Sequence, residues 1–152
     1  MTSTTWLSDA EQRAWRNWLA VATELPVALH RQLQGEFDLS LQDFDVLVQL
    51  SEAEGRRLRA SDLAQSLQWE RSRLSHHIKR MEKRGLITRE ECADDGRGAF
   101  VVLAGPGREA VERAAPSHVA TVRRIVFGAL TAAEVAAFTA TTAKILAQLR
   151  DD

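Results

Sequence analysis

Two adjacent histidines, His76 and His77, are the first residues in the chain whose types suggest chemistry. They lie in the stretch ERSRLSHHIKRMEKRGLITRE at residues 70–90, which also holds seven Lys or Arg residues. A histidine pair can bind a metal ion or transfer protons, whereas clustered cations bind anions. On a helix, however, adjacent side chains point about 100° apart, while two ligands of one ion should be about four residues apart. Because no CxxC, HExxH or carboxylate cluster supplies further ligands, we expect no metal site and no cofactor.

The cations of this stretch belong to a larger basic block. The 152-residue chain has a formal net charge of only -1, yet residues 56–89 hold ten basic and three acidic residues, a net charge of +7, against -8 elsewhere. A basic block within an acidic protein is typical of a face presented to a polyanion. Charge alone leaves a second interpretation open, namely an ordinary helix face exposed to solvent.

A helical projection separates the side chains of the basic segment. Leu74, Ile78 and Met81 fall on one side, which we expect to be buried, and His77 falls on the shoulder of that side. Small polar residues and then cations form the opposite stripe, as in a helix that reads a DNA major groove and contacts phosphates. The residues predicted to contact DNA from this helix are Arg71, Ser72, Arg73, Ser75, His76, Lys79, Arg80 and Lys83. For His77 we expect packing or a phosphate contact.

The elements that position this helix can be located from capping and periodicity. Residues 8–11, 40–43 and 131–134 each place a hydroxyl three positions before a carboxylate, which is the pattern of a capped helix start. Segments 86–90 and 99–103 flank an Asp-Gly step, which predicts a β-hairpin. Helices are expected over residues 8–34, from 40 to near 55, over 61–67, over 70–85, over 108–127 and over 131–149.

This order of elements predicts a mainly α fold with a small β-hairpin wing in a single chain of 152 residues. Short helix, turn, basic helix and hairpin form a winged helix-turn-helix, which we place at residues 40–104. The long apolar stripes of residues 8–34 and 108–150 need a partner. We expect them to pack together and against a second copy of the chain as dimerisation helices.

Residues in the turn of the predicted hairpin have expected roles in binding DNA and in supporting the wing. Arg97 lies where a guanidinium can enter a minor groove, although a solvent-exposed loop arginine has the same sequence signature. Asp95 would repel phosphate, so we expect it to support the wing by pairing with a neighbouring arginine. Cys92, the one cysteine, lies at the base of the wing.

Quoted in full, the segment LAQSLQWERSRLSHHIKRMEKRGLITREECADDGRG, followed by VVLAGPG, resembles the multiple antibiotic resistance regulator (MarR) family of bacterial winged-helix transcription factors. The matching features are the Leu-Ala step at 63–64, the serines at 72 and 75, the MEKRGL motif and the Asp-x-Arg wing at 95–97. The chain departs from the family at Trp69-Glu70, where Ser or Asp usually caps the recognition helix and Glu is a poorer N-cap.

The resemblance implies a partner and a mode of control. Family membership implies a homodimer on a roughly palindromic operator in double-stranded DNA, and repression relieved by a small ligand, often an aromatic acid or phenol. Such a ligand would bind between the dimerisation helices and the DNA-binding lobe. Residues predicted to line this pocket are Trp15, Trp18, His30, Phe37 and Phe44. Core packing or the dimer interface explains the same five residues equally well.

Other functions are less well supported by the residues. A redox-responsive regulator would use Cys92, but Glu90, Glu91, Asp94 and Asp95 nearby disfavour its thiolate. A winged helix that contacts proteins instead of DNA remains an alternative. The chain lacks the motifs of nucleophilic, metal-dependent or phosphate-binding enzymes, so we expect no enzyme. Without a signal-peptide pattern or a long apolar run, we expect a cytoplasmic protein that does not contact membranes.

Overall fold

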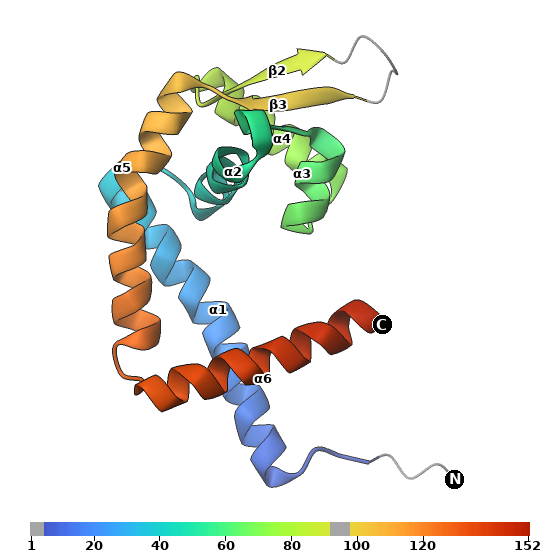
Figure 1. Cartoon of the computed structure of the whole chain (residues 1–152), viewed down its shortest axis with the longest axis vertical. Coiled ribbons are helices and arrows are strands. Elements are labelled where there is room, and N and C mark those ends of the chain that lie inside the picture. The colour runs from blue at the N-terminus through green and yellow to red at the C-terminus, as the bar shows by residue number, and fades with distance from the viewer. Residues whose placement is uncertain (1–4, 92–97) are drawn as a thin grey trace. The chain divides into compact units, whose positions relative to one another are not determined.

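The computed structural model describes residues 5–91 and 98–152, which form two compact units divided between Ala114 and Ala115. The helices of the first unit are α1 (Asp9–Phe37), α2 (Leu41–Glu52), α3 (Ala60–Leu67) and α4 (Arg71–Lys83), and its strands are β1 (Arg57–Arg59), β2 (Ile87–Glu91) and β3 (Ala99–Leu103). Helix α5 (Gly105–Val122) crosses the division and is followed by α6 (Ala132–Asp151). The predicted mainly α fold with a small wing is confirmed (Figure 1).

Three helices begin at the capping boxes expected from the sequence. Ser8, Ser40 and Thr131 each accept a hydrogen bond from the backbone N–H three residues later, and the carboxylate at that position accepts one in return. These bonds satisfy N–H groups that the first helical turn leaves unpaired. Helices α3 and α4 have no side-chain cap, and α3 begins at Ala60 instead of at the predicted Ser61.

The sheet has one strand more than the predicted hairpin. Its order is β1-β3-β2, and both pairings are antiparallel, with Leu58 opposite Val101 and Ile87 opposite Leu103. Strand β1 was not predicted because three residues following a 3₁₀ turn show too short an alternation to indicate a strand. One sheet face supplies Ile87, Val101 and Leu103 to the core. In Figure 1, β2 and β3 extend together as the wing.

The core of the first unit fixes the position of α4. Fully buried side chains come from α1, α2, α3, α4 and the sheet, and they include Leu33, Leu47, Leu63, Met81 and Val101. Closely packed aliphatic side chains resist changes of volume, so the elements that carry them cannot shift independently of one another. The buried side of α4 therefore packs against α3 and β2, and through the shared core it is also fixed relative to α2.

Helix α5 begins earlier than expected, at Gly105 instead of at residue 108. The sequence GPG at residues 105–107 does not delay the helix, because proline is tolerated in a first helical turn, where its missing N–H is not needed. The backbone N–H of Arg108 donates to the carbonyl of Ala104, and the N–H of Ala104 donates to the carbonyl of Leu86. The helix start is thus tied to the residue that precedes β2.

Gly107 permits this close approach, and we expect Gly107→Ala to lower the free energy of unfolding. A Cβ at position 107 would lie 2.0 Å from the carbonyl oxygen of Leu86, so the backbone must move. We expect a loss of about 1–3 kcal/mol, as for other overpacked sites, measured by urea denaturation. Gly105→Ala is the matched control, because nothing lies within 4 Å of its added Cβ. Equal stability of the two variants would contradict the steric argument.

The second unit exposes an unusual amount of apolar surface. It contains the end of α5, a π-helical segment (Arg123–Phe127) and α6, and α6 has no buried residue within the unit as described. Pro116 lies inside α5 without ending it. Among the described residues no single helix qualifies as a membrane span by length and composition. The bent pair Gly105–Phe127 and Ala132–Asp151 passes that test together, as core helices of soluble proteins also do.

Candidate nucleic-acid interface

Helix α4 has one buried side and one exposed side, as its sequence predicts. Leu74, Ile78 and Met81 are at most 3% exposed. The eight residues predicted to contact DNA are all exposed: Arg71, Ser72, Arg73, Ser75, His76, Lys79, Arg80 and Lys83. Five of these eight are Arg or Lys, so the exposed side presents a concentrated positive charge to an anionic partner.

The two adjacent histidines point to different sides of α4. His76 is exposed, whereas His77 is only 8% exposed, as its predicted place on the shoulder of the buried side implies. Within residues 5–91 and 98–152, no group of three or more His, Cys, Asp or Glu side chains is placed to hold a metal ion. The two side chains therefore lie in different environments, His76 at the surface and His77 beneath it.

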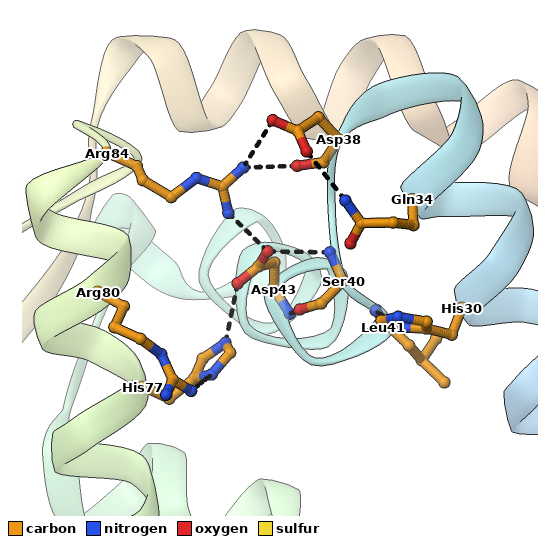
Figure 2. A network of polar contacts seen from close by, with 9 residues as sticks. All are labelled: His30, Gln34, Asp38, Ser40, Leu41, Asp43, His77, Arg80 and Arg84. Carbon is orange, nitrogen blue, oxygen red and sulfur yellow. Dashed lines mark hydrogen bonds and ion pairs between the residues drawn. The ribbon is translucent and has the colours of Figure 1, made fainter.

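His77 contacts a buried carboxylate on one side and an arginine on the other (Figure 2). Its Nδ1 lies 3.1 Å from Nη2 of Arg80, and its Nε2 lies 2.9 Å from Oδ1 of Asp43. A guanidinium only donates hydrogen bonds, so Nδ1 must be the acceptor and the ring proton lies on Nε2, facing Asp43. The Nε2 contact has an ion-pair distance but poor hydrogen-bond angles.

Asp43 is the centre of a polar network beneath α4 (Figure 2). Its carboxylate accepts hydrogen bonds from the Ser40 backbone N–H at 2.9 Å and from Nη1 of Arg84 at 2.8 Å. Burial by itself raises the pKa of this carboxyl, but His77, the Ser40 N–H and Arg84 together hold the pKa well below its usual range. Asp43 is therefore ionised at neutral pH although its side chain is buried.

Arg84 connects three helices at the end of α4. Besides Asp43, at the start of α2, its guanidinium donates to the backbone carbonyl of Asp38, which ends α1. Gln34 donates to the Asp38 carboxylate at 2.9 Å, so the same network reaches back into α1. The Arg84–Asp43 bond links residues 41 positions apart in the chain. No local pattern signals such a contact, so the role of Arg84 cannot be predicted from the sequence.

Trp69 supports the other end of the exposed face. It lies in the turn between α3 and α4, half-buried, with its ring edge-to-face with the His77 ring at a centroid distance of 5.4 Å. The guanidinium carbon of Arg73 lies 4.5 Å from the centre of the Trp69 ring, within the range of a cation–π contact. From the sequence, Trp69 is only a departure from the usual cap, because contacts between rings leave no linear pattern.

The base of the wing is held by ion pairs and stacked arginines. Nε of Arg89 lies 3.2 Å from Glu82, and Nη1 of Arg57 lies 3.4 Å from Glu90. The guanidinium of Arg57 also covers the ring of Phe100 at 4.4 Å. The predicted minor-groove residue Arg97, the predicted wing support Asp95 and the proposed redox residue Cys92 all lie outside the described residues.

A hollow of about 270 Å³ lies beside the exposed face of α4. It is lined by residues of α3, α4 and the sheet, among them Ser61, Arg71, Ser75 and Arg89. The same hollow is lined by apolar residues, among them Leu74, Ile78 and Val101. Arg71 on α4 and Arg89 on β2 therefore border one hollow, although Arg89 is paired with Glu82.

The five residues predicted to line a ligand pocket are spread along the first unit. Trp15 borders a shallow hollow with Trp6 and Leu7, whereas Nδ1 of His30 accepts a hydrogen bond from the Leu41 backbone N–H. Trp18 is exposed, Phe37 is half-buried and Phe44 is buried. At about 1.5 Å per helical residue, Trp15 and Phe37 are roughly 33 Å apart along α1, so both cannot line one small cavity of a single protomer.

Comparison with known proteins connects this geometry to a family. The MarR family model matches residues 37–98. The structure of AbsC, a MarR family transcriptional regulator from Streptomyces coelicolor, superposes with a TM-score of 0.90 at 43% sequence identity, covering 98% of this chain and 100% of AbsC. The chain belongs to the MarR family. MarR proteins are transcriptional regulators, so the expectation that this protein is not an enzyme is confirmed.

Further MarR structures support the fold assignment. Sco3205, a MarR family regulator from Streptomyces coelicolor crystallised in complex with DNA, is 38% identical, with a TM-score of 0.89 and coverage of 97% of this chain and 92% of Sco3205. MepR from S. aureus, also in complex with DNA, is 22% identical with a TM-score of 0.78, covers 88% of this chain and 96% of MepR, and shows the fold alone. Among proteins with curated functions, none matches the sequence.

Proposed function

We propose that this MarR-family protein is a homodimeric regulator that binds a roughly palindromic site in double-stranded DNA. Each α4 enters a major groove, and each wing enters the adjoining minor groove, where Arg97 is the proposed contact. The observation that carries the proposal is the exposed stripe of α4, with five cations on the exposed side and Leu74, Ile78 and Met81 buried on the other. The similarity to Sco3205, which was crystallised with DNA, supports it.

The test is a binding measurement with two DNA fragments. Fluorescence anisotropy should show at least about 10³-fold tighter binding to the region upstream of the protein's own gene than to a scrambled fragment of equal length. His76→Ala should reduce this preference, because His76 is exposed on the stripe that we propose reads base edges. Absence of DNA binding by the intact protein would instead favour a winged helix used for protein contacts.

The dimer is supported by the exposed apolar side chains of α6. Phe138, Ile145 and Leu149 recur at helical spacing and are 41%, 45% and 68% exposed. Apolar patches of this kind on a regulator mark an interaction surface, and a second copy of the chain is the proposed partner.

Ile145→Asp should therefore weaken the dimer. A carboxylate buried in an apolar interface costs upward of about 2 kcal/mol, or roughly 30-fold in the dissociation constant. Sedimentation velocity over a concentration series measures this change. Lys144→Ala is the control and should leave the dimer intact, because adjacent side chains on a helix point about 100° apart and Lys144 lies outside the stripe of Phe138, Ile145 and Leu149. A variant Ile145→Asp that remains dimeric at all concentrations would place the interface elsewhere.

We propose further that the protein is a repressor released from DNA by a small aromatic acid or phenol. A ligand can release DNA only if it binds better to a lobe spacing that does not fit two half-sites. The candidate residues divide into Trp15 and Trp18 near the start of α1, and His30, Phe37 and Phe44 near its end. Salicylate should raise the melting temperature and displace DNA, and His30→Ala should weaken both effects. Displacement of DNA without a thermal shift would argue against a bound effector.

A further inference from the structure

A continuous series of contacts runs along one flank of α4. The guanidinium of Arg73 stacks on Trp69, the Trp69 ring meets the His77 ring edge-to-face, and Nδ1 of His77 contacts Arg80 at 3.1 Å. Beneath this series, Asp43 lies 2.9 Å from Nε2 of His77. Two exposed arginines are thus connected through two aromatic rings to one buried carboxylate.

The contacts leave both arginines able to bind a further anion. In a cation–π contact the flat face of the Arg73 guanidinium is used, and its N–H groups remain free at the edges. Arg80 carries five N–H donors, and only one of them is directed to Nδ1 of His77. Since the two arginines are seven residues apart, or about two helical turns, they lie on the same flank roughly 10 Å from each other.

Resting on the proposed DNA-binding function, we infer that Trp69 and His77 are positioning residues that hold the Arg73 and Arg80 guanidinium groups for two phosphates of the DNA backbone. Arg73 and Arg80 lie to one side of the stripe formed by Ser72, His76 and Lys79, which faces the base edges. A cation beside a groove-reading stripe meets the sugar–phosphate backbone. The negative charge of Asp43, 2.9 Å from Nε2 of His77, favours the tautomer that carries its proton on Nε2 and leaves Nδ1 as the acceptor for Arg80.

The advantage of such positioning is entropic. A long arginine side chain loses rotamer freedom when it binds a phosphate, and a side chain that is already oriented loses less. Removing the support while keeping the arginine should therefore weaken DNA binding by about threefold to tenfold for each support. Removing the arginine as well should abolish the effect of removing the support, because nothing is left to position.

Two double-mutant cycles test this inference on one operator fragment at constant salt. His77→Leu should weaken binding about threefold to tenfold in the wild-type background and leave it unchanged in an Arg80→Ala background. Trp69→Leu should behave in the same way towards Arg73→Ala. The conservative variants should recover much of the affinity, since Trp69→Phe keeps a ring under Arg73 and His77→Gln keeps an acceptor for Arg80.

The outcomes separate this inference from the proposed function. If His77→Leu weakens binding equally in both backgrounds, His77 has only a structural role and the inference is overturned, while DNA binding itself stands. If the wild-type protein binds no DNA, the proposed function fails, and the inference fails with it. A direct readout covers the case in which His77→Leu does not fold. Nitrogen-15 NMR of the wild-type protein should show Nδ1 of His77 unprotonated, and a proton on Nδ1 would overturn the proposed contact.

Discussion

Asp43→Asn should destabilise the protein more than any other single substitution of a polar side chain in the first unit. The carboxylate of Asp43 is buried and holds Arg84, the Ser40 N–H and His77 at once. Removing one member of a buried ion pair costs about 3–5 kcal/mol, and we expect about 3 kcal/mol here, because the Arg84 side chain keeps 41% exposure and can be hydrated. Urea denaturation at pH 7 and fixed protein concentration measures the loss.

Asp45→Asn is the matched control, two residues further along α2. Burial raises the pKa of the Asp45 carboxyl, so its charge is desolvated without the compensating contacts that Asp43 has. Removing that charge should leave the free energy of unfolding unchanged or raise it slightly. If the two variants were equally stable, the network around Asp43 would have no energetic importance.

The pH dependence of the same variants has a definite sign. The pKa of Asp43 is lower in the folded protein than in the unfolded chain, so its contribution is fully present above the unfolded value near pH 4. The contribution disappears as the pH falls through the lower folded value. The stability difference between the wild type and Asp43→Asn should therefore be constant from pH 7 to about 5 and shrink in stronger acid. For Asp45, whose folded pKa is raised, acidification should stabilise the wild type relative to Asp45→Asn.

The sequence predicts which side chains of α4 are exposed and which are buried, but it does not predict the residues of other elements that hold α4 in place. The reason is physical. Side chains on one helix obey a fixed angular spacing, so the burial of Leu74, Ile78 and Met81 follows from their positions alone. The capping role of Asp43 is equally local, because Ser40 is three residues away. Local rules of this kind also located the wing and the capped starts of α1, α2 and α6.

The contacts that the sequence does not reveal join residues far apart in the chain. Asp43 meets Arg84 and His77 only because α2 and α4 pack in one core. Charge pairs between different elements have no preferred separation along a sequence. Strand β1 exists because β3 offers it a free edge, which three residues cannot signal by themselves. Trp69 acquires its role from the rings and cations around it. Tertiary packing thus determines which of the exposed arginines are held in place.

The second large effect is expected in DNA binding as salt is varied. If about 6–10 phosphates are neutralised, affinity should fall roughly 10³–10⁵-fold between 50 and 200 mM salt, because the release of counterions from DNA is less favourable at high salt. Lys83→Ala should lower the slope of log K against log salt. Each lost phosphate contact reduces it by about 0.9, and a dimer loses the contact twice, so the change should be roughly 1.8.

The control for this measurement changes the net charge equally but elsewhere. Arg150→Ala removes an exposed cation at the end of α6 and should leave the slope unchanged. Lys83→Ala should weaken binding to the specific and the scrambled fragment alike, since a phosphate contact carries no sequence information. His76→Ala should act in the opposite manner, reducing the preference for the specific fragment with little change of slope, because the proposed contact of His76 is with a base edge and not with a phosphate. If Arg150→Ala lowers the slope of log K against log salt as much as Lys83→Ala does, binding depends only on the total charge of the protein. In that case α4 would not be the surface that contacts DNA.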